Sequence, residues 1–225
     1  MTQVALIVGA GPQLGAALGR RFGAAGLTPV LSSRNADRLK TLAAVIPNAI
    51  AFPCDATQED AVKAMVATVE AQHGTIDVCV YNPGGGFQRV EIVEQTAARM
   101  REVWETTALG GFLVGRAVAR RMVTRGKGCI LFTGATASLR GRAGFGAFAS
   151  GKFALRALSQ AMARELHPRG VHVAHVVIDG KIATSGEPGT YLNPDEIAAT
   201  YAGLYYQGSS NWTQELDLRP MKESF

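Results

Sequence analysis

Short apolar runs alternate with longer segments of helical periodicity along the whole chain. The runs are rich in Val, Ile and Leu, which is typical of buried parallel strands, and apolar residues three and four positions apart are typical of helices packed on a sheet. We expect strands near residues 3–8, 27–32, 49–52, 76–81, 128–133, 171–178 and 213–218. We expect helices near residues 13–25, 35–46, 58–73, 95–125, 146–167 and 194–206. This alternation predicts an α/β fold with a doubly wound parallel sheet of about seven strands and helices on both faces.

The first predicted strand leads into a glycine-rich turn. Residues 4–8 are followed by the sequence Gly9-Ala10-Gly11-Pro12-Gln13-Leu14-Gly15 and then by a helical pattern. Glycine lets the backbone approach a pyrophosphate, and the amide groups at a helix N-terminus attract its charge. The alternative is a turn that merely packs the helix against the strand. We favour a nucleotide site, because strand, turn and helix follow one another as in a Rossmann-type unit.

Length and composition suit one soluble domain. The chain has 225 residues with no linker or internal repeat, so we expect a single dinucleotide-binding domain over residues 1–225. No apolar run reaches the length of a membrane span, and the chain opens directly into its first strand, which leaves no room for a signal peptide. The three cysteines, Cys54, Cys79 and Cys129, lie in dissimilar contexts. We therefore expect a cytoplasmic protein without disulfides.

Neither a metal site nor a nucleic-acid site is expected. Of the four histidines, His172 and His175 are separated by an odd number of positions, so they would lie on opposite faces of a strand rather than converge on a metal. The net charge is +5, and basic residues cluster between residues 116 and 127. No nucleic-acid motif accompanies them, so we interpret this run as the solvated end of a helix.

The stretch Gly146-Ala147-Phe148-Ala149-Ser150-Gly151-Lys152 resembles the active-site helix of the short-chain dehydrogenase/reductase family. That family has a tyrosine, three residues and then a lysine, and the tyrosine hydroxyl exchanges a proton with the substrate while a hydride moves to or from a nicotinamide. Residues at i and i+4 share a helix face. The resemblance therefore implies an oxidoreductase in which Phe148 occupies the tyrosine position and only Lys152 is retained.

The resemblance also implies where the cofactor binds. Ser33-Arg34 follows the second strand without an acidic residue, as in members that pair arginine with the 2′-phosphate, so NADP(H) is expected in preference to NAD(H). Asp55 resembles the residue that contacts the adenine edge; alternatively, Asp55 and Thr57 cap the next helix. The residues that the resemblance places against the cofactor are Gly9, Gly11, Gln13, Leu14, Gly15, Ser33, Arg34, Asp55, Ala56, Asn82, Gly84, Lys152, Ile182 and Thr184.

The chain differs from the family mainly at the positions that correspond to the family's catalytic residues. The family's serine, thirteen residues before its tyrosine, corresponds to Ala135, and its asparagine corresponds to Thr107. The enoyl-reductase branch has its tyrosine seven residues before the lysine, and that position is Phe145. Replacement proton donors are sought among Thr133, Thr136, Ser138 and Ser150. Ser138 is a weak candidate, because a solvated loop hydroxyl explains it more simply. Alternatively, Phe145, Phe148 and Phe153 form an apolar wall beside the nicotinamide.

Two classes of function remain open at this point. The first is an NADP(H)-dependent oxidoreductase with a degenerate active site, and the second is a non-catalytic protein that binds or senses NADP(H). The substrate cannot be read from residues 181–193, which would line its pocket. The family pairs subunits through the helices that correspond to residues 95–125 and 146–167, so a homodimer or homotetramer is expected.

Overall fold

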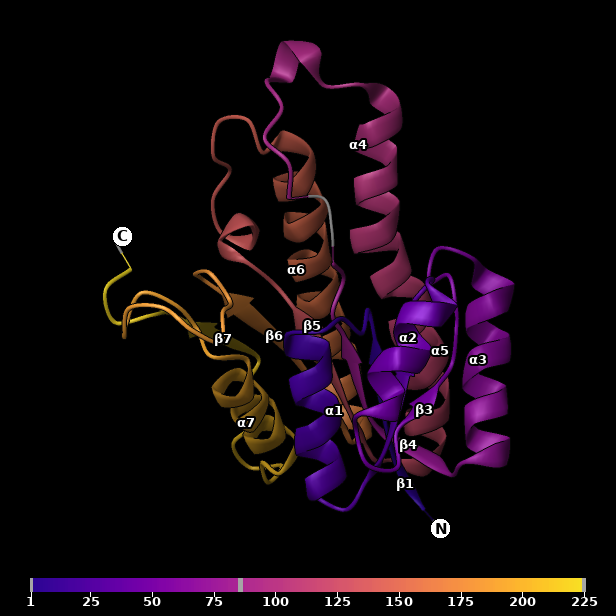
Figure 1. Ribbon diagram of the computed structural model, residues 1–225. Coiled ribbons are helices and arrows are strands. Elements are labelled where there is room, and N and C mark those ends of the chain that lie inside the picture. Colours follow the sequence, from indigo (N-terminus) through magenta and orange to yellow (C-terminus); the bar gives the residue numbers. More distant parts are fainter. Residues whose placement is uncertain (1, 85–86, 224–225) are drawn as a thin grey trace.

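The computed structural model describes residues 2–84 and 87–223 and contains a seven-stranded sheet in the order β3-β2-β1-β4-β5-β6-β7 (Figure 1). Every neighbouring pair of strands is parallel. The strands are β1 (Gln3–Val8), β2 (Thr28–Ser32), β3 (Ile50–Ala51), β4 (Thr75–Tyr81), β5 (Gly128–Thr133), β6 (Val171–Ile178) and β7 (Glu215–Leu218). This is the α/β architecture predicted from the alternating pattern.

The central strands are apolar because both faces of the sheet are covered. All eight residues of β6 and five of the six residues of β1 are buried. The strand order reverses between β1 and β4, so the connections that follow these two strands run in opposite directions. In such sheets a crevice opens beyond the carboxyl ends of the strands at this switch point.

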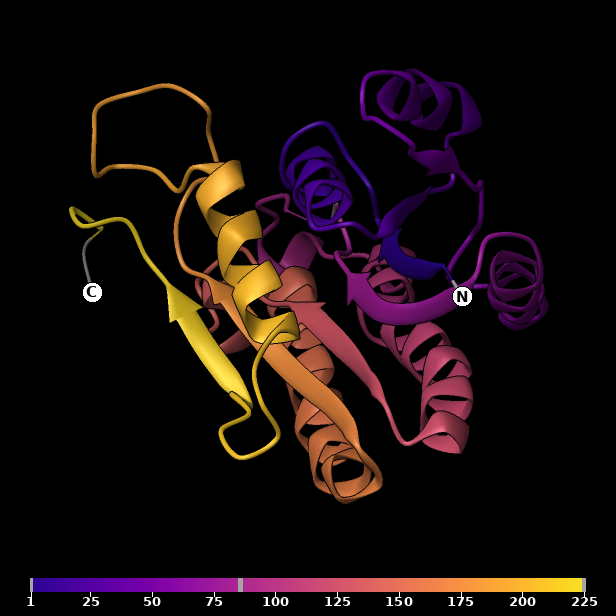
Figure 2. The ribbon, with the colours of Figure 1, turned by 90° about the horizontal axis from the view of Figure 1, so that it is seen from below.

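Two layers of helices enclose the sheet, which Figure 2 shows between them. On one face, α1 (Leu14–Ala24), α2 (Ala36–Ala44) and α7 (Pro194–Tyr205) pack a core that includes Leu18 and Tyr201. On the other face, α3 (Glu59–Gln72), α5 (Gly110–Arg125) and α6 (Gly146–Leu166) pack a core that includes Met65 and Phe132. Apolar burial on both faces therefore accounts for the fold.

The predicted helix over residues 95–125 is wrong as a single α-helix. It consists of α4 (Ala97–Trp104), a π-helical segment (Glu105–Leu109) and α5, and the 3₁₀ turn Ile92–Glu94 precedes it. The buried Tyr81 donates its hydroxyl hydrogen bond to the Thr106 carbonyl inside the π segment. Gly110 gives room for the phenol, since a Cβ there would overlap the Tyr81 hydroxyl. The π segment could not be predicted from the helical periodicity, because the contact involves Tyr81 of β4, which is distant in the sequence.

Other element boundaries follow local chemistry. The short β3 covers only two residues of the expected 49–52, and β7 starts two residues later than expected. Helix α6 ends at Leu166, before a short turn containing Pro168, and Gly170 adopts a φ of 79°. Asn193 caps α7 by accepting a hydrogen bond of 2.9 Å from the Asp195 amide. The two helices thus end within one residue of the expected ranges 146–167 and 194–206.

The basic run at the end of α5 is not merely solvated, as the sequence suggested. Arg116 pairs with Glu59 at 2.7 Å, and Arg125 pairs with Glu70 at 2.8 Å, so acidic residues of α3 neutralise much of this surface. No helix of the described residues has the length and apolar character needed to cross a membrane.

Candidate active site

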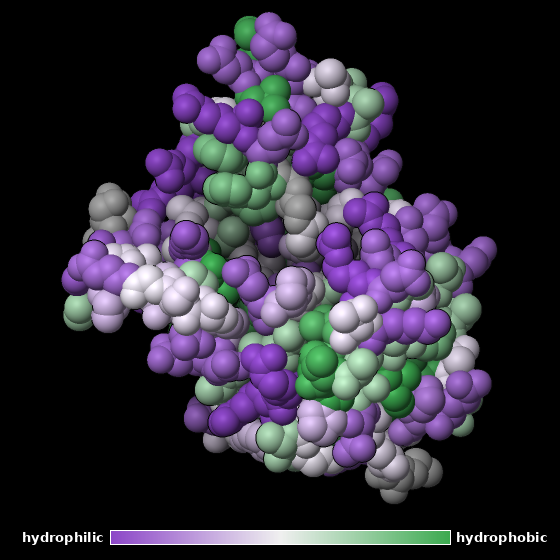
Figure 3. Space-filling model, in the orientation of Figure 1, coloured by the Kyte–Doolittle hydropathy of each residue, from purple (hydrophilic) through white to green (hydrophobic). Residues whose placement is uncertain are grey.

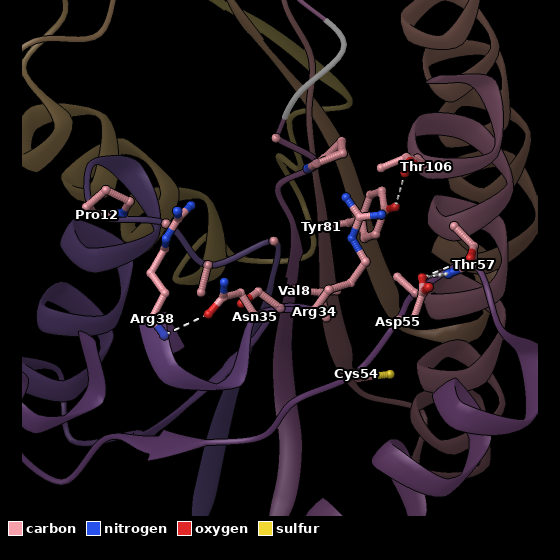
Figure 4. Close-up of a pocket in the computed structure, with 17 residues that line it drawn as sticks. Val8, Pro12, Arg34, Asn35, Arg38, Cys54, Asp55, Thr57, Tyr81 and Thr106 are labelled. Carbon is pink, nitrogen blue, oxygen red and sulfur yellow. Dashed lines mark hydrogen bonds between the residues drawn. The ribbon is translucent and has the colours of Figure 1, made fainter. Parts of the chain in front are cut away.

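A cavity of about 350 Å³ lies beyond the carboxyl ends of β1, β2 and β4, at the switch point of the sheet (Figure 4). Residues from the connections after β1, β2, β3 and β4 line it, because the carboxyl ends of parallel strands meet at one edge. The lining includes Gly9, Gly11, Pro12, Ser33, Arg34, Asn35, Arg38, Asp55, Ala56, Thr57, Tyr81, Gly84 and Thr106. Much of the predicted nucleotide site is thus brought together in one crevice.

The glycine turn lines this cavity, and each of its three glycines has a different structural role. Gly9 has a φ of 87°, and a Cβ there would overlap the Asn82 carbonyl oxygen. Asn82 in turn donates from Nδ2 to the Gly9 carbonyl at 3.1 Å, so it holds the turn. A Cβ on Gly15 would lie 2.8 Å from the Ala10 Cα. A Cβ on Gly11 would meet nothing within 4 Å, so this glycine leaves open space where a ligand can approach the backbone.

The start of α1 faces the same space without a side-chain cap. Gln13 occupies the N-cap position but makes no capping hydrogen bond, and its Nε2 instead donates to the Ile182 carbonyl at 3.3 Å. The first amide groups of α1 therefore carry a partial positive charge that suits an anion. The contact also ties the glycine turn to the segment after β6. Thr184, expected near the cofactor, is exposed in that segment and does not line the cavity.

Two arginines line the cavity, Arg34 from the β2–α2 connection and Arg38 from the first turn of α2. Figure 4 shows the Arg34 guanidinium directed toward Tyr81 and Thr106, and the Arg38 guanidinium on the side of Pro12. Asn35 caps α2 by accepting a hydrogen bond of 2.9 Å from the Arg38 amide. In residues 2–84 and 87–223, neither guanidinium has a carboxylate within ion-pair distance. The sequence analysis did not include Arg38 in the site, although it follows Arg34 by only four residues.

Asp55 does not cap α3, so that alternative interpretation is wrong. Its Oδ1 accepts hydrogen bonds from the Thr57 amide at 3.0 Å and the Thr57 hydroxyl at 2.8 Å, whereas the N-cap of α3 is Gln58. These local bonds fix the Asp55 carboxylate at the wall of the cavity. Its second oxygen accepts no hydrogen bond from the described residues, which suits a nucleobase donor.

Lys152 does not line this cavity and is buried in α6 against the end of β5. The side chain is 3% exposed and its Nζ donates to the Thr133 carbonyl at 2.8 Å. Burial lowers the pKa of the amine from 10.5 to about 7. The Nζ lies 5.7 Å from the centre of the Phe148 ring, one helical turn earlier in α6. An apolar ring therefore stands beside the amine, in agreement with the shared helix face expected from the sequence.

Thr107 and Ala135 are the residues that the resemblance aligns with the family's asparagine and serine. Thr107 is buried within the π segment and packs on α6, since a Cβ on Gly151 would lie 3.0 Å from the Thr107 Cβ. Ala135 follows β5, and its amide donates to the Ser138 hydroxyl at 3.1 Å. Thr107 has a hydroxyl but no carboxamide, and Ala135 has no hydroxyl, so neither side chain carries the group expected from the resemblance.

Each replacement hydroxyl considered from the sequence already has a partner. The Thr133 hydroxyl pairs with the Tyr201 hydroxyl at 2.9 Å, and the Thr136 hydroxyl donates to Asp179. The Ser150 hydroxyl donates to the Ala147 carbonyl at 2.9 Å. These hydroxyls are therefore committed to the protein rather than to a ligand.

Ser138 is not the solvated loop residue that the sequence suggested. It is completely buried, and its hydroxyl lies 3.3 Å from His175 Nε2. The His175 ring lies directly under the β5 connection, because a Cβ on Gly134 would overlap it. Burial lowers the pKa of His175 to about 4, so the imidazole is neutral at pH 7. The burial of Ser138 removes it as a proton donor to a ligand.

The apolar wall expected from three phenylalanines has a different composition. Phe145 and Phe148 both contact Phe87, with ring centres 5.0 Å and 5.6 Å apart. Phe153 takes no part in these ring contacts and is 42% exposed on α6. Phe87 comes from the β4–α4 connection, which the sequence did not connect with this helix.

Comparison with known proteins identifies the family. A family model described as short chain dehydrogenase matches residues 3–187. A 2-dehydro-3-deoxy-D-gluconate 5-dehydrogenase of Formosa agariphila is 30% identical over 188 residues, which are 81% of this chain and 70% of that protein. The crystal structure of a short-chain dehydrogenase from Rhodopseudomonas palustris is 40% identical, with a TM-score of 0.88, and the match covers 97% of this chain and 98% of that chain. A metagenomic short-chain oxidoreductase in complex with NADP is 28% identical, with a TM-score of 0.86, and the match covers 98% of each chain. This chain therefore belongs to the short-chain dehydrogenase family.

Proposed function

We propose that this protein binds NADP(H) in the crevice at the switch point and is a short-chain oxidoreductase with a degenerate active site. The observation that carries the proposal is the cavity itself, which combines an open glycine turn, an uncapped helix N-terminus and two arginines without acidic partners in the described chain. The pyrophosphate would lie against Gly11 and the amides of α1. The adenine would lie near Asp55 and Ala56, and the ribose near Gly84.

The preference for NADP(H) follows from charge. Arg34 and Arg38 offer two cations to the 2′-phosphate, and Ser33 takes the place of an acidic residue that would repel it. The structural relative bound to NADP supports this assignment. Lys152 would hold the hydroxyls of the nicotinamide ribose, as the resemblance of its helix to the family's active-site helix implies.

Catalysis is proposed to be weak, because the site lacks a proton donor at the position of the family's tyrosine. When bound, the nicotinamide supplies the hydride, but a carbonyl that accepts it becomes an alkoxide. Phe148 and Ala135 cannot stabilise or protonate that oxygen. Thr133, Thr136, Ser138 and Ser150 are all occupied within the protein.

A second candidate function is a non-catalytic protein that binds or senses NADP(H). The same observations favour it, since the cavity has an open glycine turn and two arginines while the proton-transfer groups are replaced. A cofactor titration followed by a panel of carbonyl substrates separates the two functions. Binding without turnover of any member of the panel supports the sensor.

The protein is expected to bind NADPH at least about tenfold more tightly than NADH. Loss of a charge-assisted contact with the 2′-phosphate is worth about 1.5–3 kcal/mol, which corresponds to about tenfold or more in Kd. Titration of NADPH and NADH fluorescence measures the two constants. Arg34→Glu should abolish the preference. Equal affinities in the native protein, or no change on Arg34→Glu, would contradict the assignment.

Two glycine variants make the matched control for this titration. Gly11→Ala adds a methyl group to open space in the cavity, and Gly203→Ala adds one to open space on α7. Both variants are expected to fold, because neither methyl group meets an atom within 4 Å. Only Gly11→Ala should weaken NADPH binding, by about tenfold or more if the methyl group displaces one charge-assisted phosphate contact. Equal binding by both variants would place the pyrophosphate elsewhere.

We also propose a homodimer or homotetramer that works in the cytoplasm. The face of α4, α5 and α6 exposes large apolar side chains, namely Met100, Trp104, Phe112 and Phe153. Free, buried cysteines suit a reducing compartment. Light scattering at micromolar concentration should give a multiple of the monomer mass, and Phe153→Asp should lower that mass. A monomeric native protein would refute this assembly.

A further inference from the structure

Three aromatic rings from two distant segments form an exposed corner. Phe87 and Phe145 are stacked with ring centres 5.0 Å apart and planes 24° apart. Phe148 meets Phe87 almost edge-on, at 5.6 Å and 83°. Phe87 keeps 75% of its surface exposed, although burying such a ring is favourable by about 1.5–3 kcal/mol. The exposed part of Phe87 therefore leaves the corner with an apolar aromatic surface that no other described residue covers.

This corner is continuous with the proposed chemical site. Phe148 lies at the position of the family's proton donor, and its ring centre is 5.7 Å from Lys152 Nζ. Phe145 precedes Phe148 by three residues. Phe87 contacts both rings and extends their apolar surface. A molecule placed on Phe87 and Phe145 would thus reach the end of the crevice where the nicotinamide is proposed to lie.

The backbone holds the two segments together. The Val90 amide donates to the Gly144 carbonyl at 2.8 Å, and the Phe145 amide donates to the Arg142 carbonyl at 3.0 Å. Gly144 has a φ of 83°, and a Cβ there would lie 3.2 Å from Arg89 Nε. Main-chain contacts between the two segments therefore position the rings, in addition to the contacts between the rings themselves.

The surroundings of the corner are apolar on one side and carry both signs of charge on the other. Ile92, 76% exposed, lies beside α6, since a Cβ on Gly146 would be 3.5 Å from its Cδ1. Arg89, Glu91 and Arg142 are exposed at the margin. Figure 3 shows apolar side chains in the upper half of this face, above a hollow and bordered by hydrophilic ones. Mixed charges do not select a net charge on a ligand, whereas stacked rings select a flat one.

We propose that Phe87, Phe145 and Phe148 form the substrate subsite and that it takes a neutral, flat molecule containing an aromatic or otherwise unsaturated ring. The inference rests on the proposed function, since it assigns the substrate of the same site. A flat ring gains an offset stack or an edge contact with each phenyl group, and a puckered saturated ring of equal size does not. The subsite selects the molecule through its shape and apolar surface.

The test compares 2-naphthol with decahydro-2-naphthol, which have the same carbon number and the same hydroxyl group. Binding is measured by calorimetry and by NMR titration on the full chain, with and without saturating NADPH. We expect 2-naphthol to bind more tightly, and Phe87→Leu to raise its Kd about three- to tenfold, as loss of an aromatic pair predicts. Phe145→Leu should act in the same way. Phe153→Leu is the control, because this ring lies on α6 outside the corner.

The outcomes separate this inference from the proposed function. Tight NADPH binding with equal binding of the two alcohols would overturn the flat-ring subsite and leave the nucleotide site intact. Loss of NADPH binding, with 2-naphthol still sensitive to Phe87→Leu, would overturn the nucleotide site and support the subsite. If 2-naphthol fails to bind and Phe87→Asp lowers the mass in light scattering, the corner is a contact between copies and the inference falls.

Discussion

The double variant Ala135→Ser/Phe148→Tyr is expected to reduce carbonyl compounds with NADPH at least about 10²-fold faster than the native protein. A positioned general acid contributes about 10²–10⁴ in rate, or roughly 3–5.5 kcal/mol of barrier. The native protein should show negligible turnover of ordinary ketones and aldehydes. The variant gains activity because Lys152 already lies one helical turn after residue 148, with its amine close to that side chain.

Each single change should restore much less activity than the pair. The serine hydroxyl and the tyrosine hydroxyl act on the same developing alkoxide, so their effects are not additive. Phe148→Tyr places a phenol near an amine whose pKa is lowered to about 7, and the protonated amine favours the phenolate form. Ala135→Ser adds a hydroxyl at the entrance of the β5 connection.

The measurement is NADPH consumption over a panel of aldehydes and ketones for the native chain, both single variants and the double variant. Phe153→Tyr is the matched control, since it adds a phenol to the same helix away from Lys152. Rapid native turnover that persists in Ser138→Ala and Lys152→Met would contradict the degenerate site. Another group would then supply the proton.

Lys152→Met is expected to stabilise the nucleotide-free protein by about 2–4 kcal/mol at pH 7. Burial lowers the pKa of Lys152 from 10.5 to about 7. Each pH unit between these two pKa values adds about 1.4 kcal/mol to the free-energy cost of burying the charged amine. From the sum over the whole interval, about 1–3 kcal/mol is subtracted, because the Thr133 carbonyl loses its hydrogen-bond donor in the variant. The isosteric apolar side chain removes the cost of burying the charged amine.

The gain should disappear as the pH rises. Between pH 7 and pH 10.5 the unfolded chain holds a proton that the folded protein has released, so the native free energy of unfolding rises with pH over this interval. Below pH 7 both states are protonated and the native protein carries the full penalty. Urea unfolding at pH 7 and at pH 10 measures the difference. Lys40→Met, at an exposed position of α2, should change stability equally at both values. A gain for Lys152→Met that is constant with pH would contradict a depressed pKa.

The alternation of apolar runs and helical segments was sufficient to predict the architecture. Residues 3–8 and 171–178 are mostly apolar because both faces of the sheet are covered, so the sequence pattern and the burial agree. The resemblance to the short-chain dehydrogenase family implied that the glycine turn and the loops after β2, β3 and β4 face one cofactor, and residues from these four segments line one cavity. The architecture therefore follows from local pattern, and the grouping of these segments follows from the family resemblance.

The tertiary structure alone decided the partners of individual side chains. Ser138 is buried because His175, on a neighbouring strand, lies beneath it, and the helix before Lys152 contains a π segment because Tyr81 binds Thr106. Phe87 joins the aromatic corner through contacts with residues almost sixty positions later in the chain. The hydrophobic periodicity of the sequence predicts none of these contacts, because each joins segments that are distant in the sequence and meet only in the packed structure. The sequence by itself therefore determined the fold and the residues available at the crevice, and packing determined which of those residues keep a free polar group or an exposed ring.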